Sequence, residues 1–125
     1  MRVILVDDER ELVITLSERL GFRGIESDWA VNGADAVKLV SENAYDLAVL
    51  DVKLPGISGL ELKKQLQVID PDMKFIFVTG HGSRADFQTG SQEAGADYYL
   101  IKPVNIDILV EKMNEALKSK QGDAP

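Results

Sequence analysis

The chain has 125 residues, which fits one domain of ordinary size built around a single hydrophobic core. Hydrophobic residues make up 45% and charged residues 28%, a balance typical of a soluble globular protein and not of a disordered or membrane-embedded one. Acidic residues outnumber basic ones 21 to 14, for a net charge of −7, so we expect no direct binding to nucleic acid, because such affinity depends on neutralising phosphates. The absence of cysteine excludes disulfides and thiolate metal sites.

The start of the chain, MRVILVDDER, carries too short an apolar run for a signal peptide. No stretch of the sequence approaches the roughly 18 apolar residues that a membrane span requires. We therefore expect a cytoplasmic protein without a membrane partner.

Short apolar runs alternate with amphipathic stretches from end to end, which is typical of a parallel sheet covered by helices on both faces. Strands are predicted at residues 3–6, 25–30, 47–50, 75–78 and 98–101. The second of these mixes polar and apolar side chains, so we expect it at an edge of the sheet.

Between the strands, apolar residues recur with the spacing of one buried helical stripe. Such stripes are formed in chain order by Leu12, Val13, Leu16 and Leu20; by Ala36, Val37 and Val40; by Leu62, Leu66 and Ile69; and by Ile106, Leu109, Val110, Met113 and Leu117. A further helix is predicted at residues 83–94. It carries few large apolar residues and contains Gly90, so it should be the least stable.

Five strand and helix units joined by right-handed crossovers predict an α/β fold with a doubly wound five-stranded parallel sheet. The expected strand order is 2-1-3-4-5, as in the flavodoxin-like (βα)5 fold. We expect the domain to cover residues 1–119, with residues 120–125 as a flexible tail or the start of a linker.

Polar residues stand at the carboxyl ends of four predicted strands. Asp7 and Asp8 follow the first strand, Asp51 the third, Thr79 the fourth and Lys102 the fifth. An Asp after a strand is commonly only a turn or a helix cap. Ligands of open α/β sheets bind at this edge, however, and four strand ends meeting there predict a functional site.

The three carboxylates would repel one another and raise their pKa values if nothing compensated their charge. A hard cation resolves this, and an oxygen-only set with open water positions suits Mg²⁺. A carboxylate nucleophile beside such a cation can form an acyl phosphate. Lys102 would add a positive charge for the transferring phosphoryl oxygens, and Thr79 a hydroxyl donor.

Four motifs, LVDDE, LAVLDVKLPGISGLEL, FIFVTGHG and YYLIKP, follow one another over nearly the whole chain. In order, spacing and residue type they resemble the receiver domains of two-component response regulators. The resemblance implies that Asp51 is phosphorylated by a histidine kinase or phosphotransfer protein. It also implies a signalling switch that changes shape and that catalyses only its own phosphorylation and dephosphorylation, so we do not expect a metabolic enzyme.

The resemblance further implies a ligand set for the cofactor, Mg²⁺. Asp8, Asp51 and the backbone carbonyl of Lys53 would bind the ion, and Asp7 would act mostly through water. The implied downstream partner is a protein target or an output domain on a longer chain. A second copy of the chain, joined after phosphorylation, is compatible with the same resemblance.

For the phosphorylated state, the resemblance implies that Lys102 contacts the phosphoryl group. It also implies a cis peptide bond between Lys102 and Pro103, which would turn the Lys102 ammonium into the pocket. Thr79 and Tyr99 would form the switch pair, with the Tyr99 ring turning from an exposed to a buried position. Gly80 stands after Thr79, where the family often has Ala, and leaves the phosphoryl group room.

Neighbouring residues have plainer interpretations. Pro55, Gly56 and Gly59 in PGISG are interpreted as a turn before a helix. His81 lies between glycines and no second His exists, so a loop role is favoured over metal binding.

Two other classes share part of the pattern. A haloacid-dehalogenase-like phosphatase also uses a strand-end Asp with Mg²⁺ and Lys, but it requires an acid two residues later, where this chain has Lys53. A flavodoxin-type flavin module needs a phosphate-cradling loop after the first strand, and DDER is acidic there. A degenerate receiver, never phosphorylated, is disfavoured because every key residue is present.

Overall fold

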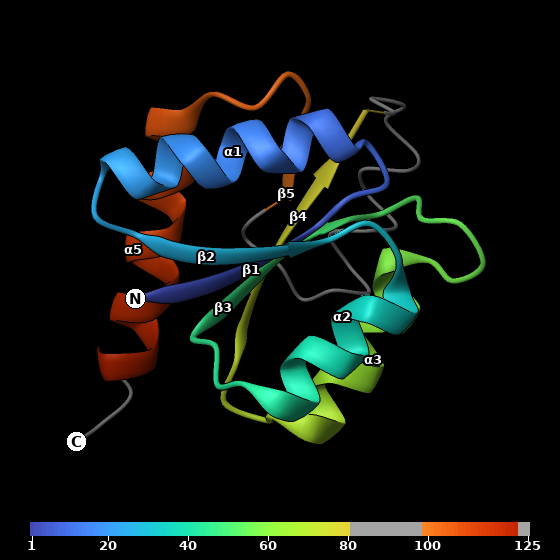
Figure 1. Cartoon of the computed structure of the whole chain (residues 1–125). Helices are drawn as coiled ribbons and strands as arrows, with labels where there is room; N and C mark the ends of the chain where they lie inside the picture. The colour runs from blue at the N-terminus through green and yellow to red at the C-terminus, as the bar shows by residue number, and fades with distance from the viewer. Residues whose placement is uncertain (81–98, 123–125) are drawn as a thin grey trace.

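A five-stranded parallel sheet forms the centre of the computed structural model, which describes residues 1–80 and 99–122 (Figure 1). The strand order is β2-β1-β3-β4-β5, as predicted, and the mixed second strand lies at an edge. The strands are β1 (Arg2–Val6), β2 (Glu26–Ala30), β3 (Leu47–Asp51), β4 (Lys74–Thr79) and β5 (Tyr99–Ile101).

Helices cover both faces of the sheet (Figure 1). Those described are α1 (Arg10–Phe22), α2 (Gly33–Glu42), α3 (Gly59–Ile69) and α5 (Ile106–Gly122). Helices α1 and α5 pack on one face, and α2 and α3 on the other. The helix predicted at residues 83–94 and the loop residue His81 lie outside the described residues. Helix α5 continues to Gly122 and so enters the segment expected to be a tail.

Each face of the sheet has its own apolar core, because successive side chains of a strand point to opposite faces. The core under α2 and α3 includes Ile4, Val6, Ala36, Val40, Leu50, Leu62, Leu66 and Phe77. The core under α1 and α5 includes Val3, Leu5, Val13, Leu16, Leu20, Ile76, Leu109 and Met113. Strands β1 and β3 contribute to both cores, which explains why they are apolar almost throughout.

Two stripe positions differ from the predicted pattern. Ile69 is 41% exposed, because it is the last residue of α3 and lies where the helix leaves the sheet. In the last buried turn of α5, the buried residue is Ala116, which is 1% exposed, whereas Leu117 is only partly buried.

No helix in the described part of the chain is both long and apolar enough to cross a membrane.

A polar network closes the end of the sheet opposite the predicted site. The Tyr45 hydroxyl donates a hydrogen bond of 2.6 Å to Asp28 Oδ2. The Arg2 guanidinium reaches the same oxygen at 3.1 Å and lies over the Tyr45 ring, 5.1 Å from its centre. Burial, followed by this hydrogen bond, raises the pKa of the Tyr45 phenol.

We expect Tyr45→Phe to lower the free energy of unfolding by about 1 kcal/mol, because it removes one hydrogen bond and keeps the ring. Since the raised pKa favours the neutral phenol in the folded state, this contribution should be present below about pH 10 and decline above it. Urea denaturation measures the change. In a double-mutant cycle with Asp28→Asn, additive losses would show that the two side chains are not coupled.

Candidate functional site

The four predicted strand ends converge at the carboxyl edge of the sheet. Asp7 directly follows β1, Asp51 ends β3, Thr79 ends β4 and Lys102 directly follows β5. The parallel register pairs Val6 with Leu50. Asp7, the residue after Val6, therefore lies opposite Asp51, the residue after Leu50. Parallel pairing alone therefore gathers residues that are far apart in the sequence.

Asp7, Asp8 and Asp51 form an acidic cluster in which one oxygen of each carboxylate lies within 4.8 Å of the others. Asp7 and Asp51 are buried, each 6% exposed, whereas Asp8 faces solvent. A set of carboxylate oxygens, open to water on one side, fits a hard cation such as Mg²⁺. The backbone N–H of Lys53 donates to Asp51 Oδ1 at 3.2 Å, while the predicted use of the Lys53 carbonyl as a ligand stays a prediction.

The Lys102 ammonium provides the positive charge in this pocket. Its Nζ atom lies 2.7 Å from Asp7 Oδ2, 2.7 Å from Glu9 Oε1 and 3.4 Å from Asp51 Oδ2. Burial acts to lower the pKa of Lys102, but the hydrogen bonds to Asp7 and Glu9 and the charges of Asp7 and Asp51 outweigh it and raise the pKa. The side chain is 13% exposed and carries a full charge at neutral pH.

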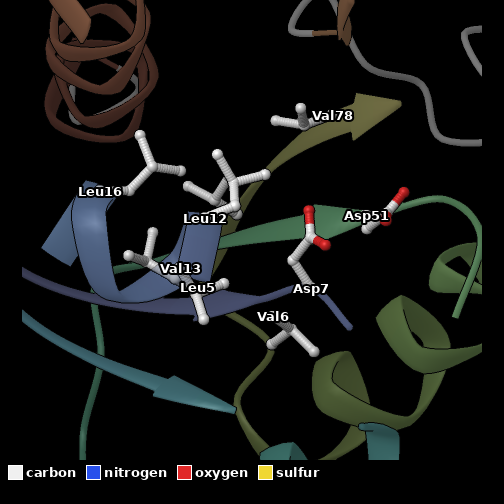
Figure 2. Close-up of a pocket in the computed structure, with 9 residues that line it drawn as sticks. Leu5, Val6, Asp7, Leu12, Val13, Leu16, Asp51 and Val78 are labelled. Carbon is white, nitrogen blue, oxygen red and sulfur yellow. The ribbon is translucent and has the colours of Figure 1, made fainter. Parts of the chain in front are cut away.

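A small apolar cavity lies beneath the two buried carboxylates (Figure 2). Its volume is about 10 Å³, no more than one water molecule requires. Besides Asp7 and Asp51, it is lined by Leu5, Val6, Leu12, Val13, Leu16, Val49 and Val78. Burial in these surroundings, and then the charge of Asp7, raises the pKa of Asp51; the Lys53 N–H and Lys102 act in the opposite direction.

The last residue of β4 and the first residue after β5 are tied together beside the pocket. The Lys102 N–H donates to the Thr79 carbonyl at 2.8 Å, and the Lys102–Pro103 peptide bond is cis, as predicted. Thr79 is 1% exposed. The Tyr99 ring is 7% exposed and stacks on Phe77 with centroids 6.4 Å apart, so this structure has the ring in the buried position.

Two residues of the site were not identified from the sequence. Glu9 was not singled out, although it contacts Lys102, and only its place in the run DDE could have indicated it. Gly59 was interpreted as part of a turn, which proves incomplete. It is the first residue of α3, and a Cβ atom there would lie 2.2 Å from the Asp51 carbonyl oxygen, so Gly59 lets α3 begin against the backbone of Asp51.

The family model described as "Response regulator receiver domain" matches residues 3–114, nearly the whole chain. The chain belongs to the response-regulator receiver domains. A curated relative is the sporulation initiation phosphotransferase F of Bacillus subtilis, 33% identical over 119 residues that cover 95% of both chains.

Solved receiver structures agree with this fold. The response regulator TrrA of Thermotoga maritima, solved in complex with Mg(2+)-BeF, has a TM-score of 0.77 and 38% identity, and the match covers 92% of this chain and 97% of that one. A Burkholderia pseudomallei response regulator with a phosphorylated aspartic acid has a TM-score of 0.81 and 28% identity, covering 98% and 72%. The receiver domain spans about half of some relatives, such as 53% of the Mycobacterium response regulator MprA.

We expect Gly59→Ala to destabilise the receiver domain by about 1–3 kcal/mol, because the added methyl group would overlap the backbone of Asp51. Gly80→Ala is the matched control, since its nearest contact would be the Lys102 Cδ atom at an ordinary 3.7 Å. Urea denaturation of both variants measures the difference. Equal stability of the two variants would contradict the close approach at Gly59.

We expect Asp51→Asn to raise the free energy of unfolding of the metal-free protein at about pH 7. Because burial raises the pKa of Asp51 above 3.8, the folded state binds the proton more tightly, and the wild type loses stability as pH rises through that range. The advantage of the Asn variant should therefore shrink as pH falls and vanish at about pH 2.5, where the carboxyl is protonated in both states. Urea denaturation in a chelator measures this. An Asn variant that is less stable at neutral pH would show that the Lys102 and Lys53 contacts outweigh burial.

Proposed function

We propose that this receiver domain accepts a phosphoryl group on Asp51 from the phosphohistidine of a histidine kinase or phosphotransfer protein, in a Mg²⁺-dependent reaction. The observation that carries the proposal is the position of the Asp51 carboxylate, which lies within the acidic cluster and 3.4 Å from the Lys102 ammonium. The printed descriptions of the two solved relatives, one with Mg(2+)-BeF and one with a phosphorylated aspartic acid, support it.

In this proposal, Asp8, Asp51 and the Lys53 carbonyl would hold Mg²⁺, and Asp7 would act through water. When bound, the ion supplies positive charge for the phosphoryl oxygens and for the clustered carboxylates. An Asp51 oxygen would form a bond to phosphorus while the bond from phosphorus to the donor histidine nitrogen breaks, and the histidine would leave as neutral imidazole after taking a proton from water. Lys102 and the Thr79 hydroxyl then stabilise charge on the transferred group. Because Asp7 and Asp51 are buried against apolar side chains, these electrostatic contacts are strengthened.

Receiver domains act as signalling switches, and we propose that this one signals through Thr79 and Tyr99. A bond from Thr79 to a phosphoryl oxygen would draw its loop inward, and the buried position of Tyr99 would then be favoured. The recipient of the signal would be a protein target or an output domain of a longer chain, consistent with the greater length of MprA. The site of action we propose is the cytoplasm.

The test is incubation with Mg²⁺ and a small phosphodonor such as acetyl phosphate, followed by intact-mass measurement. The wild type should gain the mass of one phosphoryl group, and Asp51→Asn should gain none, because an amide cannot accept it. Chelation of the metal should abolish the gain.

Asp8→Ala serves as the control for the metal. It keeps the acceptor and the buried pair but removes the exposed ligand, so phosphorylation should require more Mg²⁺ while the protein stays folded. An equal mass gain in Asp51→Asn would show that the acceptor lies elsewhere in the chain.

A further inference from the structure

Glu9 occupies the N-cap position of α1 but does not cap the helix. Its side chain makes no hydrogen bond to the backbone of the first turn, which Ser, Thr, Asp or Asn would make at this position. Instead its Oε1 atom lies 2.7 Å from Lys102 Nζ, across 93 residues of sequence. The position thus gives up a local helix contact and makes a contact with the pocket.

The three contacts of the Lys102 ammonium differ in one respect. An ammonium has three donors, and here they face Asp7, Asp51 and Glu9. Asp7 and Asp51 belong to the acidic cluster that fits the cation, whereas Glu9 does not. A cation in the cluster would engage the oxygens of Asp7 and Asp51 and would also repel the ammonium. Of the three carboxylates that contact Lys102, Glu9 is then the one that would not bind the metal and would keep its contact with the ammonium.

We propose that Glu9 is a positioning residue that keeps the Lys102 ammonium in the pocket when Mg²⁺ is bound. The inference rests on the proposed function, because it concerns how Lys102 remains available to a phosphoryl group. Without Glu9, the long and flexible Lys102 side chain would stay in the metal-free pocket, held by Asp7 and Asp51, and would move toward solvent once Mg²⁺ binds.

The first measurement follows Lys102 itself by NMR. In protein with 13C-labelled lysine, the two Hε protons of Lys102 are inequivalent while the side chain is fixed and become equivalent when it moves freely; the signals are assigned by their loss in Lys102→Arg. In the wild type they should stay distinct with and without Mg²⁺. In Glu9→Ala they should stay distinct without Mg²⁺ and merge at saturating Mg²⁺.

The second measurement is the affinity for beryllofluoride, a mimic of the phosphoryl group, at saturating Mg²⁺ by 19F NMR. Glu9→Ala should bind it about 2–5-fold more weakly, the size expected for a largely exposed ion pair. Glu9→Gln should lie between the two, because its amide oxygen can still accept from Lys102. Glu11→Ala, which removes a carboxylate from the exposed first turn of α1, is the matched control and should bind like the wild type.

Each outcome decides the inference. If Glu9 only repelled anions through its charge, Glu9→Ala and Glu9→Gln would both bind beryllofluoride more tightly, and this would overturn the inference. Lys102 signals that stay distinct in Mg²⁺-loaded Glu9→Ala would overturn it as well. Failure of the proposed function would be seen separately, in either of two results. The wild type would not bind beryllofluoride at all, or Asp51→Asn would bind it as tightly as the wild type does.

Discussion

The contact between the Lys102 ammonium and the buried carboxylates of Asp7 and Asp51 is the interaction on which the site depends. Both carboxylates are nearly excluded from water, and burial of like charges at close range is costly. Lys102 offsets part of that cost in the metal-free protein, at distances of 2.7 and 3.4 Å. The remaining cost keeps the pKa of Asp51 raised, and the pocket retains the oxygen ligands that a cation would use.

The parallel sheet makes this arrangement possible. Because β1, β3, β4 and β5 run in the same direction, their carboxyl ends meet at one edge, and residues from positions 7 to 102 lie in one pocket. The apolar residues that precede them in the strands form the two cores. Apolar side chains of the core that stabilises the fold also surround Asp51 and raise its pKa.

The start of α3 imposes a second constraint on the site. Ser58 caps the helix by accepting from the Glu61 N–H at 3.1 Å, and the Gly59 N–H donates to the Val52 carbonyl at 2.8 Å. The first residue of α3 therefore packs against the backbone of Asp51, the proposed acceptor, and of Val52, the residue after it. A change at Gly59 would act on Asp51 through the backbone and not through any charged group.

Three features could be predicted from the order of residues: the strand order, the edge position of β2 and the convergence of Asp7, Asp51, Thr79 and Lys102. These follow from hydrophobic periodicity and from the rule that parallel strands share one carboxyl edge, both of which are local or topological. For the same reason four helices appeared where apolar stripes predicted them. The prediction that Ile69 is buried was wrong, because periodicity alone does not show where a helix leaves the sheet.

The partners of individual side chains depend on how the elements pack and could not be predicted. Glu9 meets Lys102 because α1 begins beside the loop that follows β5, and a separation of 93 residues leaves no periodic signal of that contact. Gly59 is required by the distance between a helix start and a strand end, which depends on how α3 packs and not on turn propensity. The pKa of Asp51 likewise depends on the apolar walls contributed by β1, α1, β3 and β4. Residue types and spacing fix which groups reach the edge, whereas packing between elements fixes their distances, and electrostatic energies depend on those distances.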